Sequence, residues 1–119
     1  MDATELNEIQ ESIIKTIQKL SGDNPAYDYF TVDFIAYINT AINILQGIGV
    51  GDASFVLTGV DDKWEDFIPD GKGLGLVKAF VKFKTTLYFD PPNNSFLIQN
   101  INDNLKELEY RLYCMYDEP

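Results

Sequence analysis

The residues that could do chemistry in this sequence are few. The chain has no histidine and a single cysteine, Cys114. It therefore lacks the commonest general base, the commonest metal ligand and the usual partner of a serine or cysteine nucleophile. One cysteine also excludes an internal disulfide and a multi-thiolate metal site. We expect no catalytic residue, no metal and no cofactor, and we predict that the chain is not an enzyme.

A glycine-rich run at residues 71–75, Gly-Lys-Gly-Leu-Gly, superficially suggests a phosphate-binding loop. It lacks the Walker arrangement, in which a glycine and four further residues precede Gly-Lys-Ser/Thr, and it follows no convincing strand. We therefore interpret this run as a flexible lead into a helix.

A cluster of carboxylates between residues 61 and 70 could bind Ca²⁺ or, as paired acids, hydrolyse a glycosidic bond. The cluster lacks the alternating ligands and the bidentate glutamate of an EF-hand loop, and nothing in the sequence suggests a substrate cleft. A solvated loop with a helical turn is the simpler interpretation. The cluster consists of Asp61, Asp62, Glu65, Asp66 and Asp70.

Apolar spacing predicts the elements that carry these residues. Four stretches repeat apolar positions at three- and four-residue steps, which is typical of amphipathic helices. We expect helices at about 4–20, from about 31–33 to 46, at 74–89 and at 95–116. The second helix is apolar on both faces except at Asn39 and Asn43, so it should be the most buried. The prediction is a single all-α domain over residues 1–119, a bundle of four principal helices with a long insert between the second and the third.

The insert, Gly47–Gly73, is long for a connection in a compact domain, where about 4–6 residues is usual. Residues 53–58 could form a short strand or an extended loop, and residues 61–68 one or two helical turns. The aromatic residues Phe55, Trp64 and Phe67 are expected at a partner interface. Within one subunit we expect Trp64 or Phe67 to anchor the insert.

Two adjacent prolines, Pro91 and Pro92, set the corner between the last two helices. Neither has a backbone donor, and the residue before each is pushed out of the helical region. The third helix should therefore stop near Phe89 and the fourth should begin with Ser95 as its N-cap. The two helices should pack antiparallel as a hairpin. The side chains expected in that contact are Phe80, Phe83, Leu87, Ile101, Leu105 and Leu108.

The charge balance limits the partners. Nineteen acidic and nine basic residues give a net charge of −10. Phosphate backbones should repel such a chain, so we expect no sequence-specific nucleic-acid binding. No apolar run approaches the roughly 18–20 residues that span a bilayer, and the acidic start of the chain is unlike a signal peptide. We therefore expect no membrane partner and a product made soluble in the cytoplasm.

Two further groups of residues are candidates for a partner interface. Three lysines in the third helix either form a solvated face or oppose the acidic loop of a neighbouring copy. Three tyrosines at three-residue steps near the end of the fourth helix either pack in the core or face a partner. The two groups are Lys78, Lys82 and Lys84, and Tyr110, Tyr113 and Tyr116.

Several segments together resemble the small head–tail connector, or adaptor, proteins of long-tailed bacteriophages, of the type common in phages of Gram-positive hosts. The most specific part is a helix, then Phe-Asp-Pro-Pro, a turn rich in Asn and Ser, and a helix that ends in Glu-Leu-Glu-Tyr-Arg-Leu. This chain has Thr85 and Thr86 where such relatives often carry an arginine. The matching segments are residues 37–51, 64–67, 77–92 and 105–112.

The resemblance implies a mostly helical structural subunit of the virion neck. Copies would dock as a ring, nominally of twelve, beneath the portal protein, extend the DNA channel and meet the next neck or tail-completion protein. The alternative from another class is a small acidic regulatory or binding module that acts through a single protein partner. A connector should form a cyclic ring, whereas a regulator should stop at a monomer or dimer.

Overall fold

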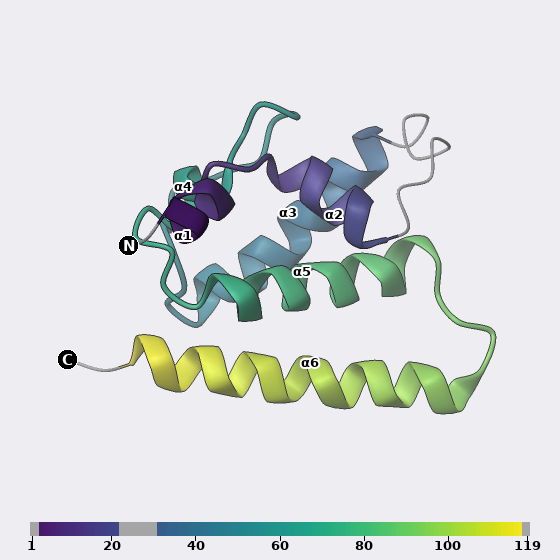
Figure 1. Cartoon of the computed structure of the whole chain (residues 1–119). Coiled ribbons are helices and arrows are strands. Elements are labelled where there is room, and N and C mark those ends of the chain that lie inside the picture. The colour runs from purple at the N-terminus through teal and green to yellow at the C-terminus, as the bar shows by residue number, and fades with distance from the viewer. Residues whose placement is uncertain (1–2, 22–30, 118–119) are drawn as a thin grey trace.

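The computed structural model of the chain describes residues 3–21 and 31–117, and these ranges are mainly helical (Figure 1). This confirms the all-α prediction. The described ranges contain no strand, only an isolated bridge between Ser12 and Lys63, so residues 53–58 form an extended loop. The helices are α1 (Ala3–Ile9), α2 (Ile13–Leu20), α3 (Thr31–Gly47), α4 (Trp64–Phe67), α5 (Leu74–Phe89) and α6 (Ser95–Tyr116).

The prediction of one continuous helix over residues 4–20 is wrong, because the chain breaks between α1 and α2. At the break the backbone pairs with the insert: the Ile13 N–H donates to the Asp62 carbonyl at 3.0 Å, and the Trp64 N–H donates to the Glu11 carbonyl at 3.2 Å. Ser12 caps α2, since its hydroxyl oxygen accepts from the Lys15 N–H at 3.3 Å. In a continuous helix these N–H and carbonyl groups would bond within the helix, so the break leaves them free to bond to the insert.

The prediction that the second helix is the most buried is wrong: α5 exposes two residues, Gly75 and Tyr88, whereas α3 exposes six of the residues whose burial is described. The buried apolar side chains of α3 lie on one face of the helix, and α5 packs along it (Figure 1). The same figure shows α5 lying between α3 and α6, so α6 forms an outer layer that packs on α5. The buried side chains of α3 are Phe34, Ile38, Ala41, Ile42 and Leu45.

The hairpin of α5 and α6 has the predicted bounds, and the two helices pack against each other as expected. Phe80 and Leu105 are buried in this contact, and the other predicted side chains are partly buried against the same core. The N-cap of α6 is Asn94 rather than Ser95: the Asn94 side-chain oxygen accepts from the Phe96 N–H at 2.8 Å. Asparagine is as good an N-cap as serine, and it stands one residue earlier.

Truncation of Leu105 tests whether α6 shares the core. Leu105 is 5% exposed, so Leu105→Ala should lower the free energy of unfolding by about 2–5 kcal/mol through the cavity it leaves. Leu97→Ala is the matched control, because Leu97 lies in the same helix but is 48% exposed, and it should change stability by no more than about 0.5 kcal/mol. Urea unfolding of both variants provides the measurement. Equal losses would mean that α6 is not part of the core.

Candidate functional site

The aromatic residues of the insert are anchors of the fold. Trp64 and Phe67 are fully buried, and the Trp64 indole N–H donates to the Thr16 hydroxyl at 3.1 Å. Phe55 stacks on Phe67 with ring centroids 5.5 Å apart. The prediction that Trp64 or Phe67 anchors the insert is confirmed for both. A partner contact by these three residues stays a prediction, and the side chains of Trp64 and Phe67 are covered within the isolated chain.

The extended part of the insert has no neighbouring strand among the described residues, and polar side chains of α3 bond to its backbone instead. The Asn39 side chain donates to the Leu57 carbonyl and accepts from the Leu57 N–H, both at 2.9 Å. Gln46 donates to the carbonyls of Asp52 and Phe55 at 3.0 and 2.9 Å. In the sequence, Asn39 is visible only as a polar residue on an apolar helix, and nothing marks Gln46.

The carboxylates of the insert shape its turns. Hydrogen bonds from the backbone N–H and the hydroxyl of Ser54 hold the pKa of Asp52 below its usual value. Within the described ranges, no group of three or more His, Cys, Asp or Glu side chains is placed to hold a metal ion. Four carboxylates each accept a hydrogen bond from a nearby backbone N–H: Asp52 from Ser54, Asp62 from Thr58, Asp66 from Lys63 and Asp70 from Lys72.

The three α5 lysines lie half-buried along their helix. The Lys82 ammonium lies 4.7 Å from the centre of the Phe83 ring, and the Lys84 ammonium lies 5.7 Å from that of Tyr88. In the described part of the chain none of the three makes an ion pair, while Arg111 and Glu107 pair on α6 at 2.7 Å. The charges of Lys78, Lys82 and Lys84 are thus available to a partner.

The three tyrosines of α6 divide into two environments. Tyr110 and Tyr113 are exposed on the outer side of the hairpin, and Tyr110 is 68% exposed. Tyr116 packs against the core and donates to the Lys72 carbonyl, and the Lys72 ammonium lies 4.8 Å from the centre of its ring. Burial, and secondarily the charge of Asp70, raises the pKa of Tyr116 to about 12, so its phenol is neutral at pH 7.

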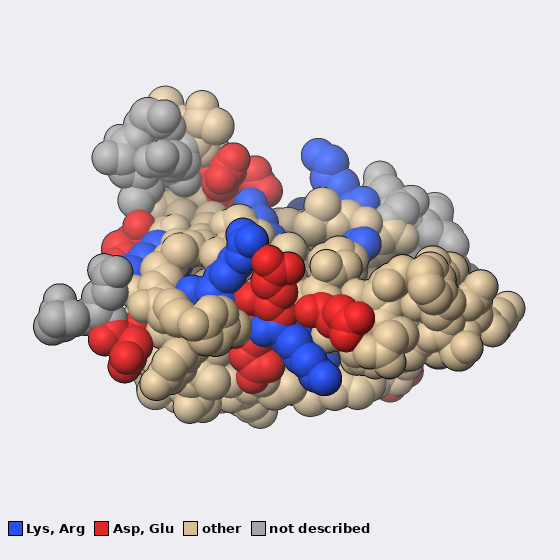
Figure 2. Space-filling view, turned by 90° about the horizontal axis from the view of Figure 1, so that it is seen from below, with Lys and Arg blue, Asp and Glu red and all other residues tan. Residues whose placement is uncertain are grey.

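The turn between α5 and α6 carries a surface that sequence reasoning missed. We define the hairpin tip as Tyr88 and residues 91–97. Phe96 is 70% exposed, and Tyr88 and Leu97 are also exposed. No charged residue occurs from Pro91 to Asn102, and in Figure 2 the lobe at the right, where the hairpin turns, is largely free of both charge colours. A charge-free run of this length in a strongly acidic chain was the signal that could have revealed the surface.

A second surface feature lies at the other end of α6. We define the insert hollow as the depression of about 470 Å³ lined by residues 49, 51, 52, 68–70 and 116. Gly51 has a φ of +71°, and a Cβ there would lie 2.5 Å from the buried Phe67 ring, so only glycine fits. Ile68, Pro69 and the neutral ring of Tyr116 make much of its lining apolar.

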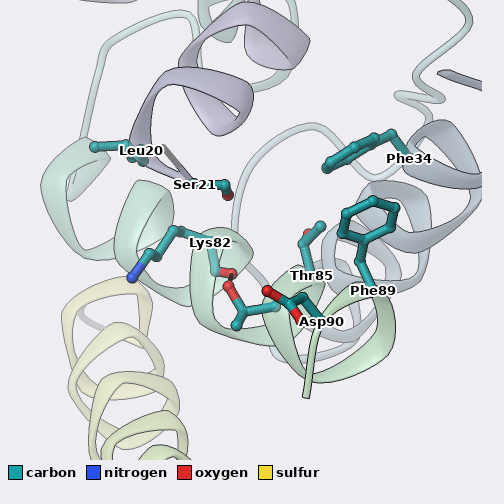
Figure 3. Close-up of a pocket in the computed structure, with 8 residues that line it drawn as sticks. Leu20, Ser21, Phe34, Lys82, Thr85, Phe89 and Asp90 are labelled. Atoms are coloured by element: carbon teal, nitrogen blue, oxygen red, sulfur yellow. Dashed lines mark hydrogen bonds between the residues drawn. The ribbon is translucent and has the colours of Figure 1, made fainter. Parts of the chain in front are cut away.

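A smaller hollow of about 180 Å³ lies where the end of α2, the start of α3 and the last turns of α5 meet (Figure 3). The Thr85 hydroxyl is buried there and has no hydrogen-bond partner in the described part of the chain. Figure 3 shows Thr85 between Asp90 and the rings of Phe34 and Phe89, with the Lys82 ammonium pointing away. Because its one buried polar group is a neutral hydroxyl, we interpret this hollow as a packing defect.

Comparison with known families now identifies the chain. A family model described as "phage connector protein" matches residues 13–119. The match spans most of the sequence, so the chain belongs to the phage connector protein family, and the predicted resemblance is confirmed. The family has a structural role in the phage particle. The Gram-positive host stays a prediction.

Comparisons with curated proteins and with solved structures found no significant match. Among the described residues, no helix is both long and apolar enough to cross a membrane.

Removal of the Asn39 side chain tests how the insert is held. Asn39→Ala leaves the N–H and carbonyl of Leu57 without their partner, which should lower the free energy of unfolding by about 1–3 kcal/mol. Asn43→Ala is the control, because Asn43 is exposed on the same helix and its loss should cost no more than about 0.5 kcal/mol. Denaturant unfolding compares the two. Equal effects would mean that Asn39 does not hold the insert.

Replacement of Thr85 tests the interpretation of the small hollow. Thr85→Val removes an unpaired buried hydroxyl at nearly constant shape, so the free energy of unfolding should rise by about 1 kcal/mol. Thr86→Val is the control: the Thr86 hydroxyl donates to the Lys82 carbonyl at 2.9 Å, and its removal should give no gain. A thermal or urea melt in which Thr85→Val is less stable than the parent would show that this hydroxyl has a partner.

Proposed function

We propose that this member of the phage connector protein family is an adaptor subunit of the virion neck. Copies form a closed ring beneath the portal protein, extend the DNA channel and meet the next neck or tail-completion protein. The observation that carries this proposal is the separation of opposite charges within one chain.

The charges divide between two neighbouring segments of sequence. Residues 71–89, which contain α5, carry four lysines and no carboxylate, whereas residues 52–70 of the insert carry six carboxylates and one lysine. The three lysines of α5, Lys78, Lys82 and Lys84, make no ion pair within the described part of the chain. Copies of a chain with net charge −10 repel one another unless unlike surfaces meet.

Head-to-tail packing brings these unlike surfaces together. The α5 lysines of one copy then face the insert carboxylates of the next. Such a contact is heterologous, since it joins two different patches, and repeated heterologous contacts close into a ring when the rotation permits. A two-fold dimer could pair the same two patches, the lysines of each copy against the carboxylates of the other, so the number of copies in the assembly is what distinguishes the two arrangements.

The remaining acidic surface suits a channel for DNA. A wall of carboxylates repels the phosphates of a passing duplex, so the DNA moves through without binding. Six of the nine basic residues lie on α2 and within residues 71–89. We place the three α5 lysines at the contact between copies or at the portal, away from the lumen.

Co-expression with the portal protein from the same gene cluster tests the proposed role. The expected result is a complex with the portal in which this chain forms a cyclic ring, detected by mass photometry and negative-stain microscopy. A chain that stays a monomer or dimer and does not bind the portal would contradict the proposal. That outcome would favour the small regulatory module.

Reversal of the α5 charges tests which surface makes the ring. The triple change of Lys78, Lys82 and Lys84 to Glu should reduce ring or portal assembly at least tenfold, because like charges then meet at the contact. Helicity measured by circular dichroism should stay nearly unchanged, since the three ammonium groups make no ion pair within the described ranges and glutamate forms helices about as well as lysine.

The matched control makes the same change of net charge elsewhere. Lys15, Lys19 and Lys106 are exposed, and their triple replacement by Glu should leave most of the assembly intact. An equal loss in both triple variants would show that net charge alone controls assembly.

Binding of the isolated protein to duplex DNA tests the acidic wall. We expect no binding at physiological ionic strength, because a chain of net charge −10 gains little from counterion release. Fluorescence anisotropy of a labelled duplex, measured over a series of salt concentrations, provides the readout. Binding that weakens as salt increases would argue against a repulsive channel.

A further inference from the structure

Two unlike surface features lie at opposite ends of the same helix. The hairpin tip precedes and begins α6, and the insert hollow includes Tyr116, the last residue of α6. Helix α6 has 22 residues, so about 33 Å separates its two ends. The hairpin tip and the insert hollow of one chain therefore cannot meet each other.

We propose that the hairpin tip of one copy seats Phe96 and Leu97 in the insert hollow of the next copy. The inference rests on the proposed ring and adds the contact that fixes its register. The occupant of the hollow is thus a second copy of this chain.

The hairpin tip has the properties of an interface anchor. Phe96 and Leu97 are exposed on a stiff corner, since Pro91 and Pro92 have fixed φ angles and the Asn94 cap holds the first turn of α6. A preformed corner loses little conformational freedom on binding. Aromatic side chains bury about 150–250 Å² each and dominate the energy of interfaces. Burial of the exposed Phe96 side chain in an interface would therefore contribute substantially to the free energy of binding.

The insert hollow matches the hairpin tip in size and chemistry. It has a volume of about 470 Å³, which is ample for one phenylalanine and one leucine side chain. Pro69 and the ring of Tyr116 offer apolar surface, and Gly49 leaves room because it has no side chain. Tyr116 is neutral at pH 7, as tyrosine is at its ordinary pKa, so no phenolate opposes an apolar guest.

Charge favours the same docking. Asp52 and Asp70 border the insert hollow, and a carboxylate on an entering segment would be repelled by them. The hairpin tip carries no charge from Pro91 onward, and Lys84 lies directly behind it, against the Tyr88 ring. Docking of the tip therefore brings a lysine of one copy toward the carboxylates of the next. This agrees with the charge separation that supports the ring.

Cross-linking in assembled phage particles tests the contact. The connector gene carries Leu97→Cys and Pro69→Cys, with Cys114→Ser to remove the exposed native thiol. A short bis-maleimide should join the two new thiols between neighbouring copies and produce a ladder of trimers and higher multimers on a denaturing gel. The matched controls carry only one of the two new cysteines, and they should give dimers at most, because each copy then has one reactive thiol.

An assembly assay gives a second readout. Phe96→Asp places a carboxylate in the insert hollow beside Asp52 and Asp70, so ring formation on the portal should fall at least tenfold. Val32→Asp is the control, because Val32 is 81% exposed on α3 and belongs neither to the hairpin tip nor to the insert hollow, so assembly should be unchanged. Both variants should keep the parent circular dichroism spectrum, since both side chains are exposed.

The outcomes separate this inference from the proposed function. A ring that forms on the portal, gives no ladder and tolerates Phe96→Asp would overturn the contact and leave the connector role standing. Particles that lack the chain, or hold it as a monomer, would overturn both.

Discussion

The placement of the insert depends on one side-chain amide of α3. The extended backbone near Leu57 has no neighbouring strand, and unpaired backbone groups are costly to bury. Asn39 supplies both missing bonds from α3. Once Leu57 is held, Trp64 can enter the core and bond to Thr16, and the backbone beside Ser12 can pair with the insert. The insert hollow and the acidic surface take their positions from this arrangement.

Local patterns predicted the parts of the fold that local physics controls. The prolines after Asp90 end α5, and regular apolar spacing sets α5 and α6. Hydrogen bonds between segments far apart in the sequence determined the features that local patterns did not predict. The first helix breaks at Ser12 because the backbone groups of Glu11 and Ile13 bond to residues of the insert, Trp64 and Asp62. Leu6 and Leu20 fit the apolar stripe of that helix and are nevertheless exposed, because the break turns α1 toward α4 and α2 toward α5.

In the candidate site, too, sequence patterns predicted some features, while others depend on the three-dimensional structure. Sequence reasoning correctly singled out Trp64 and Phe67 as anchors, because large aromatic residues in a long connection need a core to bury them. It missed the hairpin tip, because the pattern around Pro91 and Pro92 predicts where the two helices end and begin but does not show that Phe96 and Leu97 are left exposed. Four carboxylates of the insert accept backbone hydrogen bonds at its turns. In the proposed ring, the charge of the insert would also oppose the lysines of α5. A structural protein of the phage connector family can thus carry complementary surfaces on one small helical chain.

A cryo-EM reconstruction of the virion neck tests the central claim most directly, because it shows neighbouring copies in place. The account predicts a closed ring beneath the portal in which Lys78, Lys82 and Lys84 of each copy lie against the insert of the next and carboxylates line the channel. A ring in which those lysines point into the channel, or a neck that does not contain this chain, would contradict it.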